Sequence, residues 1–305
     1  MSKTTGKKIL AIGKFEGVHL GHRQLLREVV DRGKAEGLCP AVMIFRPHPY
    51  VFFGDNNYKP LFTQEEQSAL LYDTGINEII YQNFDEKFAA LSPMEFCEII
   101  FADLLASVVI VGENYRFGKG RAGDVDFLCN VAARYGSRVE VVPLRAVNGE
   151  EISTSSIRQL LGQNFAEANR QLGFPFFILG IVKKGKQLGR TIGFPTLNIY
   201  PETEKFLPID GVYYTNVKIG DKAFAGVTNI GLRPTVDSGD AVRTVETYMP
   251  CYNGEELYGA EITVEFLEFV RSEIKFGSID ELKVQIAKDV AGSNLQKSSS
   301  CRPIS

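Results

Sequence analysis

The sequence contains no tryptophan, and its charges nearly cancel: 34 Lys and Arg stand against 37 Asp and Glu in 305 residues. No apolar run approaches the roughly 18 residues that a membrane-spanning helix requires. Because positive and negative charges are almost equal in number, the protein has no general electrostatic attraction to nucleic acid or anionic lipid. We therefore expect neither a nucleic-acid partner nor a membrane partner, and any phosphate site has to be local.

Cysteine is scarce and scattered. The five cysteines form no C-x-x-C pair, and their number is odd, which argues against both a disulfide framework and a cysteine zinc cage. The first eight residues are polar and lead into only a short apolar run, unlike a signal peptide. These features predict a cytoplasmic protein. The cysteines are Cys39, Cys97, Cys129, Cys251 and Cys301.

The first half of the chain alternates short apolar runs with segments of helical periodicity. Capping boxes at Thr63-x-x-Glu66 and Ser92-Pro93-x-Glu95 predict two helix starts. This alternation predicts a parallel sheet covered by helices on both faces, with ligands beyond the carboxyl ends of its strands. The expected strands are Ile9–Ile12, Ala41–Phe45, Glu78–Tyr81, Ser107–Val111 and Arg138–Val142.

After Gly173-Phe174-Pro175 the pattern changes to apolar runs separated by Gly, Pro and Asp turns. Regularly spaced strands without intervening helices predict an antiparallel barrel or sandwich. Ser278-x-x-Glu281 opens one final helix. The expected strands are Phe176–Val182, Phe194–Ile199, Val212–Ile219, Phe224–Ile230, Val242–Met249 and Glu261–Val270.

A glycine-studded loop follows the first expected strand and leads into the first helix. Small residues let backbone N–H groups approach an anion, and a helix N-terminus adds partial positive charge. The loop has neither the Walker lysine pattern nor the G-x-G-x-x-G spacing. His19 and His22 fall on one face of the opening turn, where both rings can donate to one phosphate chain. The sequence of the loop is Gly13-Lys14-Phe15-Glu16-Gly17-Val18-His19-Leu20-Gly21-His22.

Other interpretations of the histidine pair are helix capping with core hydrogen bonding, and a zinc site, for which no third ligand lies nearby in the sequence. A second segment, Ser153-Thr154-Ser155-Ser156-Ile157-Arg158, combines hydroxyls and a cation at a helix start. It can hold a leaving pyrophosphate, although a serine N-cap with a solvated arginine explains it equally well when taken alone. Together the two segments favour an adenylyltransferase.

A glycine-rich basic loop leads into a strand in the second half: Lys183-Lys184-Gly185-Lys186-Gln187-Leu188-Gly189-Arg190-Thr191-Ile192-Gly193-Phe194-Pro195-Thr196-Leu197-Asn198. Thr196 and Asn198 are two apart on an extended segment, so their oxygens share a face and can coordinate a hard cation such as Mg²⁺. Taken alone, the loop is equally a barrel hairpin with solvated lysines.

The ordered series of motifs from Ile9 to about Val290 resembles bacterial bifunctional riboflavin kinase/FAD synthetase. The histidine loop, the block Val111–Arg121 and the serine segment resemble its nucleotidyltransferase module. Gly189–Asn198, Gly226–Thr235 and Val245-Glu246-Thr247-Tyr248 resemble its kinase module. Glu16 replaces the family's usual Asp, and Tyr248 its usual His.

The resemblance implies a Rossmann-like α/β nucleotidyltransferase domain at 1–172 and a mainly antiparallel β-barrel riboflavin kinase domain with a terminal helix at 176–290. We expect residues 291–305 to be a disordered tail. The implied reactions convert riboflavin to FMN and FMN to FAD, each with ATP and Mg²⁺. No oligomeric state is implied.

The resemblance also implies roles for individual residues. Glu246 is the expected kinase base, and His19 and His22 are expected to act on phosphate in the adenylyl step. ATP would contact Gly13, Phe15, Gly17, His19, His22, Asn114, Thr154, Ser155 and Arg158 in the first module, and Gly189, Arg190, Gly193, Pro195 and Thr196 in the second. Flavin would contact Asn229, Arg271 and Phe276, and the metal Thr196 and Asn198.

Residue type alone leaves other interpretations open. Glu246 can be a solvated strand carboxylate, and Arg271 can form an ordinary ion pair beside the terminal helix. Two alternatives to a chain with both activities remain. In one, only a single activity is retained, most simply the kinase; in the other, the chain is a flavin-binding regulator without catalytic activity. Separate assays that start from riboflavin and from FMN distinguish these possibilities.

Overall fold

The structure, a computed structural model, describes residues 6–142, 152–185, 188–202, 204–234 and 241–292. The chain divides into two compact units, residues 1–154 and 155–305. The tail expected at 291–305 lies outside the described residues, apart from its first two positions. Within the described part of the chain, no helix has the length and hydropathy needed to cross a membrane.

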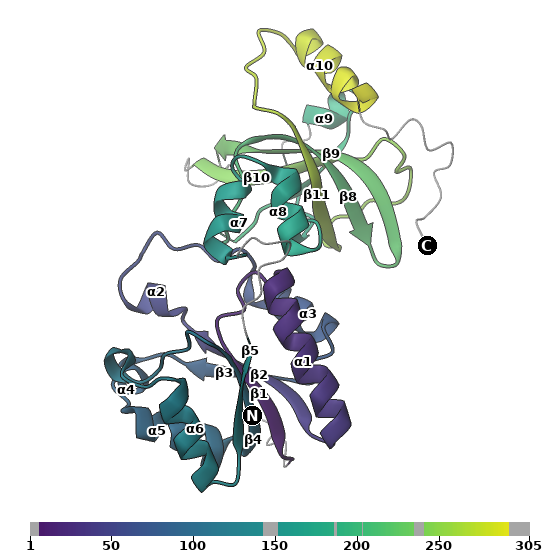
Figure 1. Ribbon diagram of the computed structural model, residues 1–305. Helices are drawn as coiled ribbons and strands as arrows, with labels where there is room; N and C mark the ends of the chain where they lie inside the picture. Colours follow the sequence, from purple (N-terminus) through teal and green to yellow (C-terminus); the bar gives the residue numbers. More distant parts are fainter. Residues whose placement is uncertain (1–5, 143–151, 186–187, 203, 235–240, 293–305) are drawn as a thin grey trace. The chain divides into compact units, whose positions relative to one another are not determined.

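The first unit alternates strands and helices along the chain (Figure 1). Its elements are β1 (Lys8–Ile12), α1 (Leu20–Glu36), β2 (Cys39–Arg46), α2 (Pro49–Phe52), α3 (Gln64–Asp73), β3 (Glu78–Asn83), α4 (Glu86–Ala89), α5 (Pro93–Glu98), the π-helix η1 (Ile99–Asp103), β4 (Ala106–Gly112), the 3-10 helix η2 (Lys119–Arg121), α6 (Val125–Arg134) and β5 (Arg138–Val142).

The five strands form one parallel sheet in the order β3-β2-β1-β4-β5. Helices α1 and α3 cover one face, and α5 and α6 cover the other (Figure 1). All five residues of β1 are buried, as expected for a central strand that packs against helices on both sides. The predicted parallel α/β sheet is therefore confirmed, and its five strands lie where the apolar runs predict them.

Local sequence signals fix the helix starts. Thr63 and Glu66 form a reciprocal capping box at α3, and Ser92 and Glu95 form another at α5. In each case the hydroxyl and the carboxylate satisfy backbone N–H groups that have no partner within the helix. Both predicted capping boxes are confirmed.

The second unit contains mostly strands. Its elements are α7 (Thr154–Leu160), which begins at the boundary between the units, α8 (Phe165–Leu172), β6 (Phe177–Ile181), α9 (Leu188–Thr191), β7 (Thr196–Ile199), β8 (Gly211–Ile219), β9 (Lys222–Pro234), β10 (Ala241–Tyr248), β11 (Glu261–Arg271) and α10 (Ile279–Gly292).

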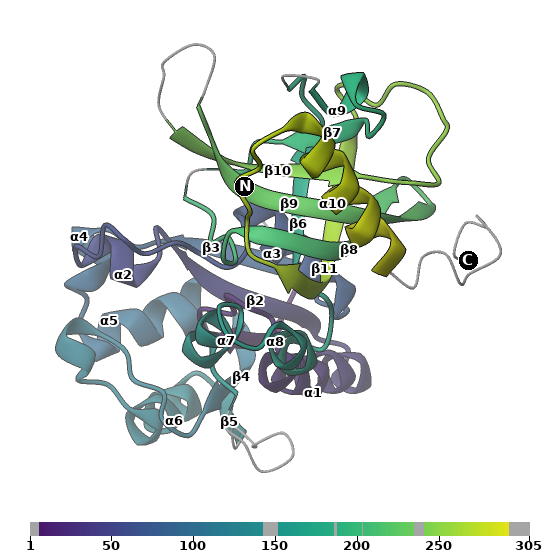
Figure 2. The same ribbon diagram turned by 90° about the horizontal axis from the view of Figure 1, so that it is seen from above.

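The six strands form an antiparallel sheet in the order β6-β11-β8-β9-β10-β7 (Figure 2). Its two edges approach each other, because Lys183, just after β6, bridges to Asn198 of β7, with a 2.8 Å hydrogen bond from the Lys183 N–H to the Asn198 carbonyl. The sheet is thus curled toward a barrel, which confirms the prediction. The short helix α9, inside the glycine-rich basic loop, was not predicted.

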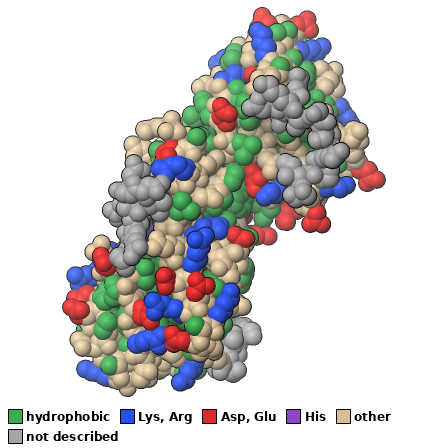
Figure 3. Space-filling model, turned by 45° about the vertical axis from the view of Figure 1, so that its right-hand side comes forward, with side chains coloured by type: hydrophobic (Ala, Val, Ile, Leu, Met, Phe, Trp, Pro, Cys, Tyr) green, Lys and Arg blue, Asp and Glu red, His purple; other side chains and the backbone are tan. Residues whose placement is uncertain are grey.

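Acidic and basic side chains are interspersed on the face drawn in Figure 3. Mixed charges of this kind screen one another over short distances and produce no broad field of one sign. This surface agrees with the near-zero net charge of the sequence.

A substitution at Gly180 of β6 can test the close approach of the two sheet edges, β6 and β7. A methyl group at this position would lie 2.4 Å from Cγ2 of the buried Ile199. We expect Gly180→Ala to lower the free energy of unfolding by about 1–3 kcal/mol through overpacking. Gly162→Ala is the control, because its added methyl would meet nothing closer than 3.5 Å. Equal urea midpoints for the two variants would contradict the packing argument.

Candidate functional sites

The carboxyl edge of the parallel sheet carries the first candidate site. The chain order reverses between β1 and β4, which are neighbours in the sheet, and loops that follow such strands diverge and leave room for a ligand. The loop after β1 begins at Gly13, whose N–H donates to the Met43 carbonyl at 3.2 Å. The loop after β4 carries the exposed Asn114. The structure therefore places both predicted segments of this unit at one edge of the sheet.

The two histidines are stacked at the start of α1, with ring centroids 3.7 Å apart. His19 is the N-cap of the helix, and its Nδ1 accepts the His22 backbone N–H at 3.4 Å. A neutral ring that accepts through Nδ1 carries its proton on Nε2, where it can donate to an anion. Capping, which the sequence left as an alternative, and phosphate binding are therefore compatible for His19.

Both imidazoles are neutral at physiological pH. Burial lowers the pKa of His19 from 6.5 to about 4. Burial also lowers the pKa of His22 well below its usual value, and the charge of a protonated His19 would lower it further. The pair therefore offers hydrogen-bond donors to a phosphate and no permanent positive charge.

The side chains around the histidine turn hold its backbone in place. Phe15 is buried, has a positive φ of 43°, and contacts the His22 ring edge-on at a centroid distance of 5.3 Å. The Gln67 amide donates to the carbonyls of Lys14 and Phe15, at 2.9 Å each. The longer carboxylate of Glu16 reaches the Leu61 N–H at 3.0 Å. Glu16 therefore links the loop to the segment before α3. Gly17 lies buried within the same loop.

The serine segment forms the start of α7. Thr154 is the first helical residue, Ser155 is exposed, and the guanidinium of Arg158 lies 5.3 Å from the ring centroid of Phe206. Ser155 and Arg158 belong to the second unit. Their participation in one site with the histidines stays a prediction.

Sequence reasoning missed a group of aromatic residues in the first unit. His48 and Tyr58 are stacked at 4.2 Å, and the Lys14 ammonium lies 3.8 Å from the centre of the Tyr50 ring. Lys14, His48 and Tyr58 line a small pocket together with Glu16 and other residues. Because His48 follows β2, the neighbour of β1, the rule that ligands lie at carboxyl ends of parallel strands could have pointed to it.

The second candidate site begins in the glycine-rich segment of the barrel. Helix α9 ends in a tight turn in which the Phe194 N–H donates to the Gly189 carbonyl at 2.8 Å. A side chain at Gly189 would meet the Phe194 carbonyl oxygen at 2.3 Å. Arg190 is exposed and pairs with Glu256 at 3.4 Å. The turn leads through Gly193 and Pro195 directly into Thr196 at the start of β7.

The pairing register collects predicted residues on one face of this sheet. Glu246 of β10 lies directly opposite Asn198 of β7 and opposite Asn229 of β9. Asn229 is opposite Val212 of β8, which is opposite Arg271 of β11. Directly opposed residues share a face of a sheet. Four residues predicted from separate motifs thus form one transverse row.

Two further predicted residues lie near the terminal helix. Arg271 donates to both carboxylate oxygens of the buried Asp289 in α10, with the shortest contact at 2.7 Å. This is the ion pair that the sequence left open, and it fastens α10 to β11. Phe276 lines a shallow groove with α10 residues, including Val284 and Gln285. Flavin contact by Arg271 and Phe276 stays a prediction.

The donor set of Thr196 and Asn198 suits a hard cation. Asn198 is buried, and its Nδ2 donates to the Thr196 carbonyl at 3.3 Å, so its amide oxygen faces elsewhere. Hydroxyl and amide oxygens are ligands that Mg²⁺ accepts. Among the described residues, no group of three or more His, Cys, Asp or Glu side chains could hold a metal.

A parallel α/β unit with a histidine turn at its switch point, followed by a curled antiparallel unit with Glu246 in its transverse row, is the arrangement of a two-unit transferase. The sequence matches the FAD synthetase family over residues 1–156 and the riboflavin kinase family over residues 172–295. The chain belongs to the family of bifunctional riboflavin kinase/FMN adenylyltransferases.

Relatives of this family cover nearly the whole chain. The bifunctional riboflavin kinase/FMN adenylyltransferase of Escherichia coli (strain K12) is 37% identical over 285 residues, which span 92% of this chain and 90% of the relative. The protein of the same name from Bacillus subtilis (strain 168) is 35% identical over 287 residues, spanning 93% and 90%. A crystal structure titled macrolide-efflux protein, from Streptococcus pneumoniae, is similar with a TM-score of 0.84 and 28% identity, covering 97% and 96% of the two chains.

The lowered pKa of His19 predicts a pH dependence of stability. In the unfolded chain His19 becomes protonated below about pH 6.5, but in the folded protein it becomes protonated only near pH 4. Protonation therefore favours the unfolded state between these pH values, so the free energy of unfolding is highest above pH 6.5 and falls as the pH drops toward 4. His19→Asn keeps a capping oxygen and should reduce this loss by about 2 kcal/mol at pH 5. Urea unfolding of both proteins at pH 7, 6 and 5 measures the difference. Parallel curves would contradict the prediction.

Proposed function

We propose that this chain performs two consecutive ATP-dependent reactions. Residues 176–290 phosphorylate riboflavin to FMN, and residues 1–172 adenylylate FMN to FAD with release of pyrophosphate. The observation that carries the proposal is the transverse row of Asn198, Glu246 and Asn229 in a chain that matches both enzyme families. A cytoplasmic location belongs to this proposal and is supported by the thiols of Cys39, Cys97 and Cys129, which form no disulfide.

In the adenylyl step, the phosphate of FMN attacks the α-phosphorus of ATP. A phosphate dianion is already nucleophilic near neutral pH, so the step needs positioning and charge stabilisation more than a base. The neutral His19 and His22 would donate hydrogen bonds to the ATP phosphates, at a helix N-terminus whose partial charge favours anions. Thr154, Ser155 and Arg158 would hold the departing pyrophosphate. The remaining nucleotide contacts would come from Gly13, Phe15, Gly17 and Asn114.

In the kinase step, a ribityl hydroxyl attacks the γ-phosphorus of ATP. An alcohol does not ionise near pH 7, so a carboxylate within hydrogen-bond reach can accept its proton or orient it. Glu246 is half-buried in the centre of the row and is the proposed base. Gly189, Arg190, Gly193, Pro195 and Thr196 would hold ATP. Thr196 and Asn198 would hold Mg²⁺, which neutralises phosphate charge when bound.

The flavin side of the kinase site would be formed by Asn229, Arg271 and Phe276. Arg271 would contribute mainly by fixing α10 through Asp289, since both carboxylate oxygens of Asp289 already accept its guanidinium. In the first unit, the stacked His48 and Tyr58 offer flat aromatic faces of the kind on which an isoalloxazine packs.

The histidine pair can be tested by His19→Ala combined with His22→Ala. The variant should lose at least about 100-fold in the rate of FAD formation from FMN, a loss typical of removing preorganised donors from a reacting phosphate. FMN formation from riboflavin should be unchanged. Chromatography of the flavins after incubation with ATP and Mg²⁺ measures both steps. Undiminished FAD formation would show that the histidines do not act on ATP.

Glu246 can be tested by Glu246→Gln, which keeps the side-chain shape and removes the base. FMN formation should fall by about 100-fold or more, as for loss of a general base. FAD formation from supplied FMN should stay at the wild-type rate, because that reaction is assigned to residues 1–172, and an unchanged urea midpoint controls for folding. A wild-type chain that makes FMN but no FAD would leave only the kinase live, and binding of flavin without ATP consumption would indicate a regulator.

A further inference from the structure

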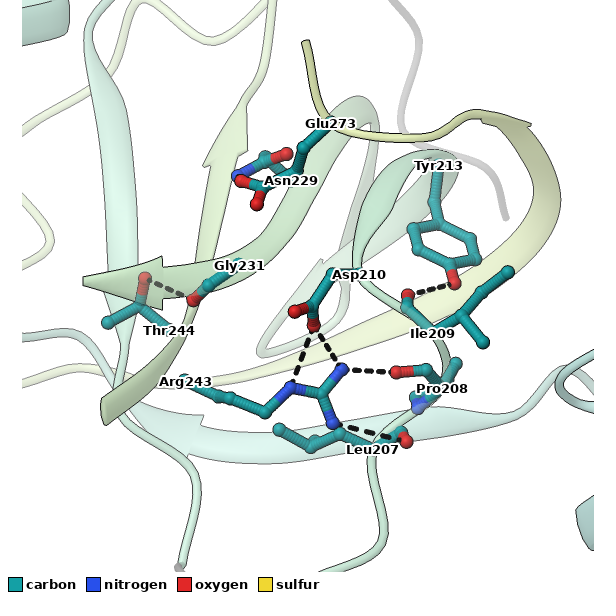
Figure 4. A network of polar contacts seen from close by, with 10 residues as sticks. All are labelled: Leu207, Pro208, Ile209, Asp210, Tyr213, Asn229, Gly231, Arg243, Thr244 and Glu273. Atoms are coloured by element: carbon teal, nitrogen blue, oxygen red, sulfur yellow. Dashed lines mark hydrogen bonds and ion pairs between the residues drawn. The ribbon is translucent and has the colours of Figure 1, made fainter. Parts of the chain in front are cut away.

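Glu273, two residues beyond β11, lies over the strand that carries Asn229. Its Oε1 accepts a hydrogen bond from Asn229 Nδ2 at 3.0 Å, and Figure 4 shows the two side chains beside each other. The same carboxylate lies over Gly231, where an added methyl would meet Oε1 at 2.1 Å. Position 231 therefore has to be small for Glu273 to occupy this place.

The contact determines how the Asn229 amide is oriented. An amide has one end that donates and one that accepts, and the two ends point in opposite directions. Because Nδ2 donates to Glu273, the acceptor Oδ1 is turned away from Glu273. Asn229 is also directly opposite Glu246 on the same face of the sheet. Its oxygen is therefore held on the face where the proposed base lies.

We propose that Glu273 is a positioning residue of the kinase site, which fixes the Asn229 amide so that Oδ1 accepts a hydroxyl of the flavin's sugar chain beside Glu246. The inference rests on the proposed kinase reaction. Without Glu273 the Asn229 amide can rotate and present its donor end, which cannot accept the proton of the substrate hydroxyl. Glu273 therefore acts on the substrate through Asn229.

The backbone around this pair is fixed independently of Glu273. Arg243 of β10 donates to the Asp210 carboxylate at 2.8 Å and to the Leu207 carbonyl at 3.3 Å (Figure 4). This network anchors the segment before β8, and Thr244 donates to the Gly231 carbonyl at 3.4 Å. Changes at Glu273 should therefore alter the amide orientation and leave the sheet in place.

Two substitutions at Glu273 separate its hydrogen bond from its charge. Glu273→Ala should raise the KM for riboflavin about five- to tenfold, the effect of losing one neutral hydrogen bond between Asn229 Oδ1 and the substrate hydroxyl, with the KM for ATP unchanged. Glu273→Gln keeps an acceptor oxygen and should restore the KM to within about twofold of wild type. The control is Glu268→Ala, an exposed carboxylate of β11 opposite Tyr214, which should have no effect.

A second route displaces the carboxylate without removing it. Gly231→Ala puts a methyl where Oε1 lies, and only the flexible end of Glu273 has to move, so the variant should fold and reproduce the KM of Glu273→Ala. Neither change should add to the effect of Asn229→Ala in a double-mutant cycle. The urea unfolding midpoint of every variant serves as the folding control.

The outcomes separate this inference from the proposed function. A wild-type chain that does not phosphorylate riboflavin overturns the kinase reaction itself. An active wild type with an unchanged KM in Glu273→Ala, or with effects of Glu273 and Asn229 that simply add, overturns the positioning role. Failure of Glu273→Gln to restore the KM shows that the charge, and not the amide contact, is what matters, and this also overturns it.

Discussion

The register of β10 against β7 and β9 is the constraint on which the second site depends. Side chains alternate between the faces of a strand, so a slip of one residue would turn Glu246 into the core and Thr247 out of it. On the buried face, the hydroxyls of Thr215, Thr228 and Thr247 form a chain with contacts of 2.7 and 2.9 Å. A slip would break this chain and bury a carboxylate. The threonine chain thus stabilises the register that exposes Glu246 beside Asn229.

The two candidate sites differ in the way their proposed chemistry requires. An anionic nucleophile needs donors and exact placement, and the first site offers two neutral imidazoles at a helix start, supported by Gln67 and Glu16. An alcohol nucleophile needs an acceptor for its proton, and the second site offers Glu246. Burial produces the first arrangement, because it removes charge from His19 and His22.

Sequence patterns predicted the elements well and the contacts between distant segments poorly. The five parallel strands, the six antiparallel strands and the capping boxes follow from local periodicity, since each pattern spans only a few residues. The partnership of Arg271 with Asp289, the position of Glu273 over Gly231 and the stacking of His48 on Tyr58 depend on where folding brings separate segments. Residue type reveals none of these partners. The motif resemblance located Glu246 and Asn229, but only the register placed them opposite each other.

The charges of the second site divide it into two parts. Glu246 and Glu273 put two carboxylates on the face that carries Asn229, and the positive charge of Arg271 is already matched by Asp289. Such a row accepts hydrogen bonds from an uncharged polyol and repels a triphosphate. In the proposed kinase reaction the phosphates would therefore bind at the glycine-rich turn, and β7 leads from that turn directly to the row. The proposed transfer between the two parts would then require only that the terminal phosphate reach a hydroxyl bound beside Glu246.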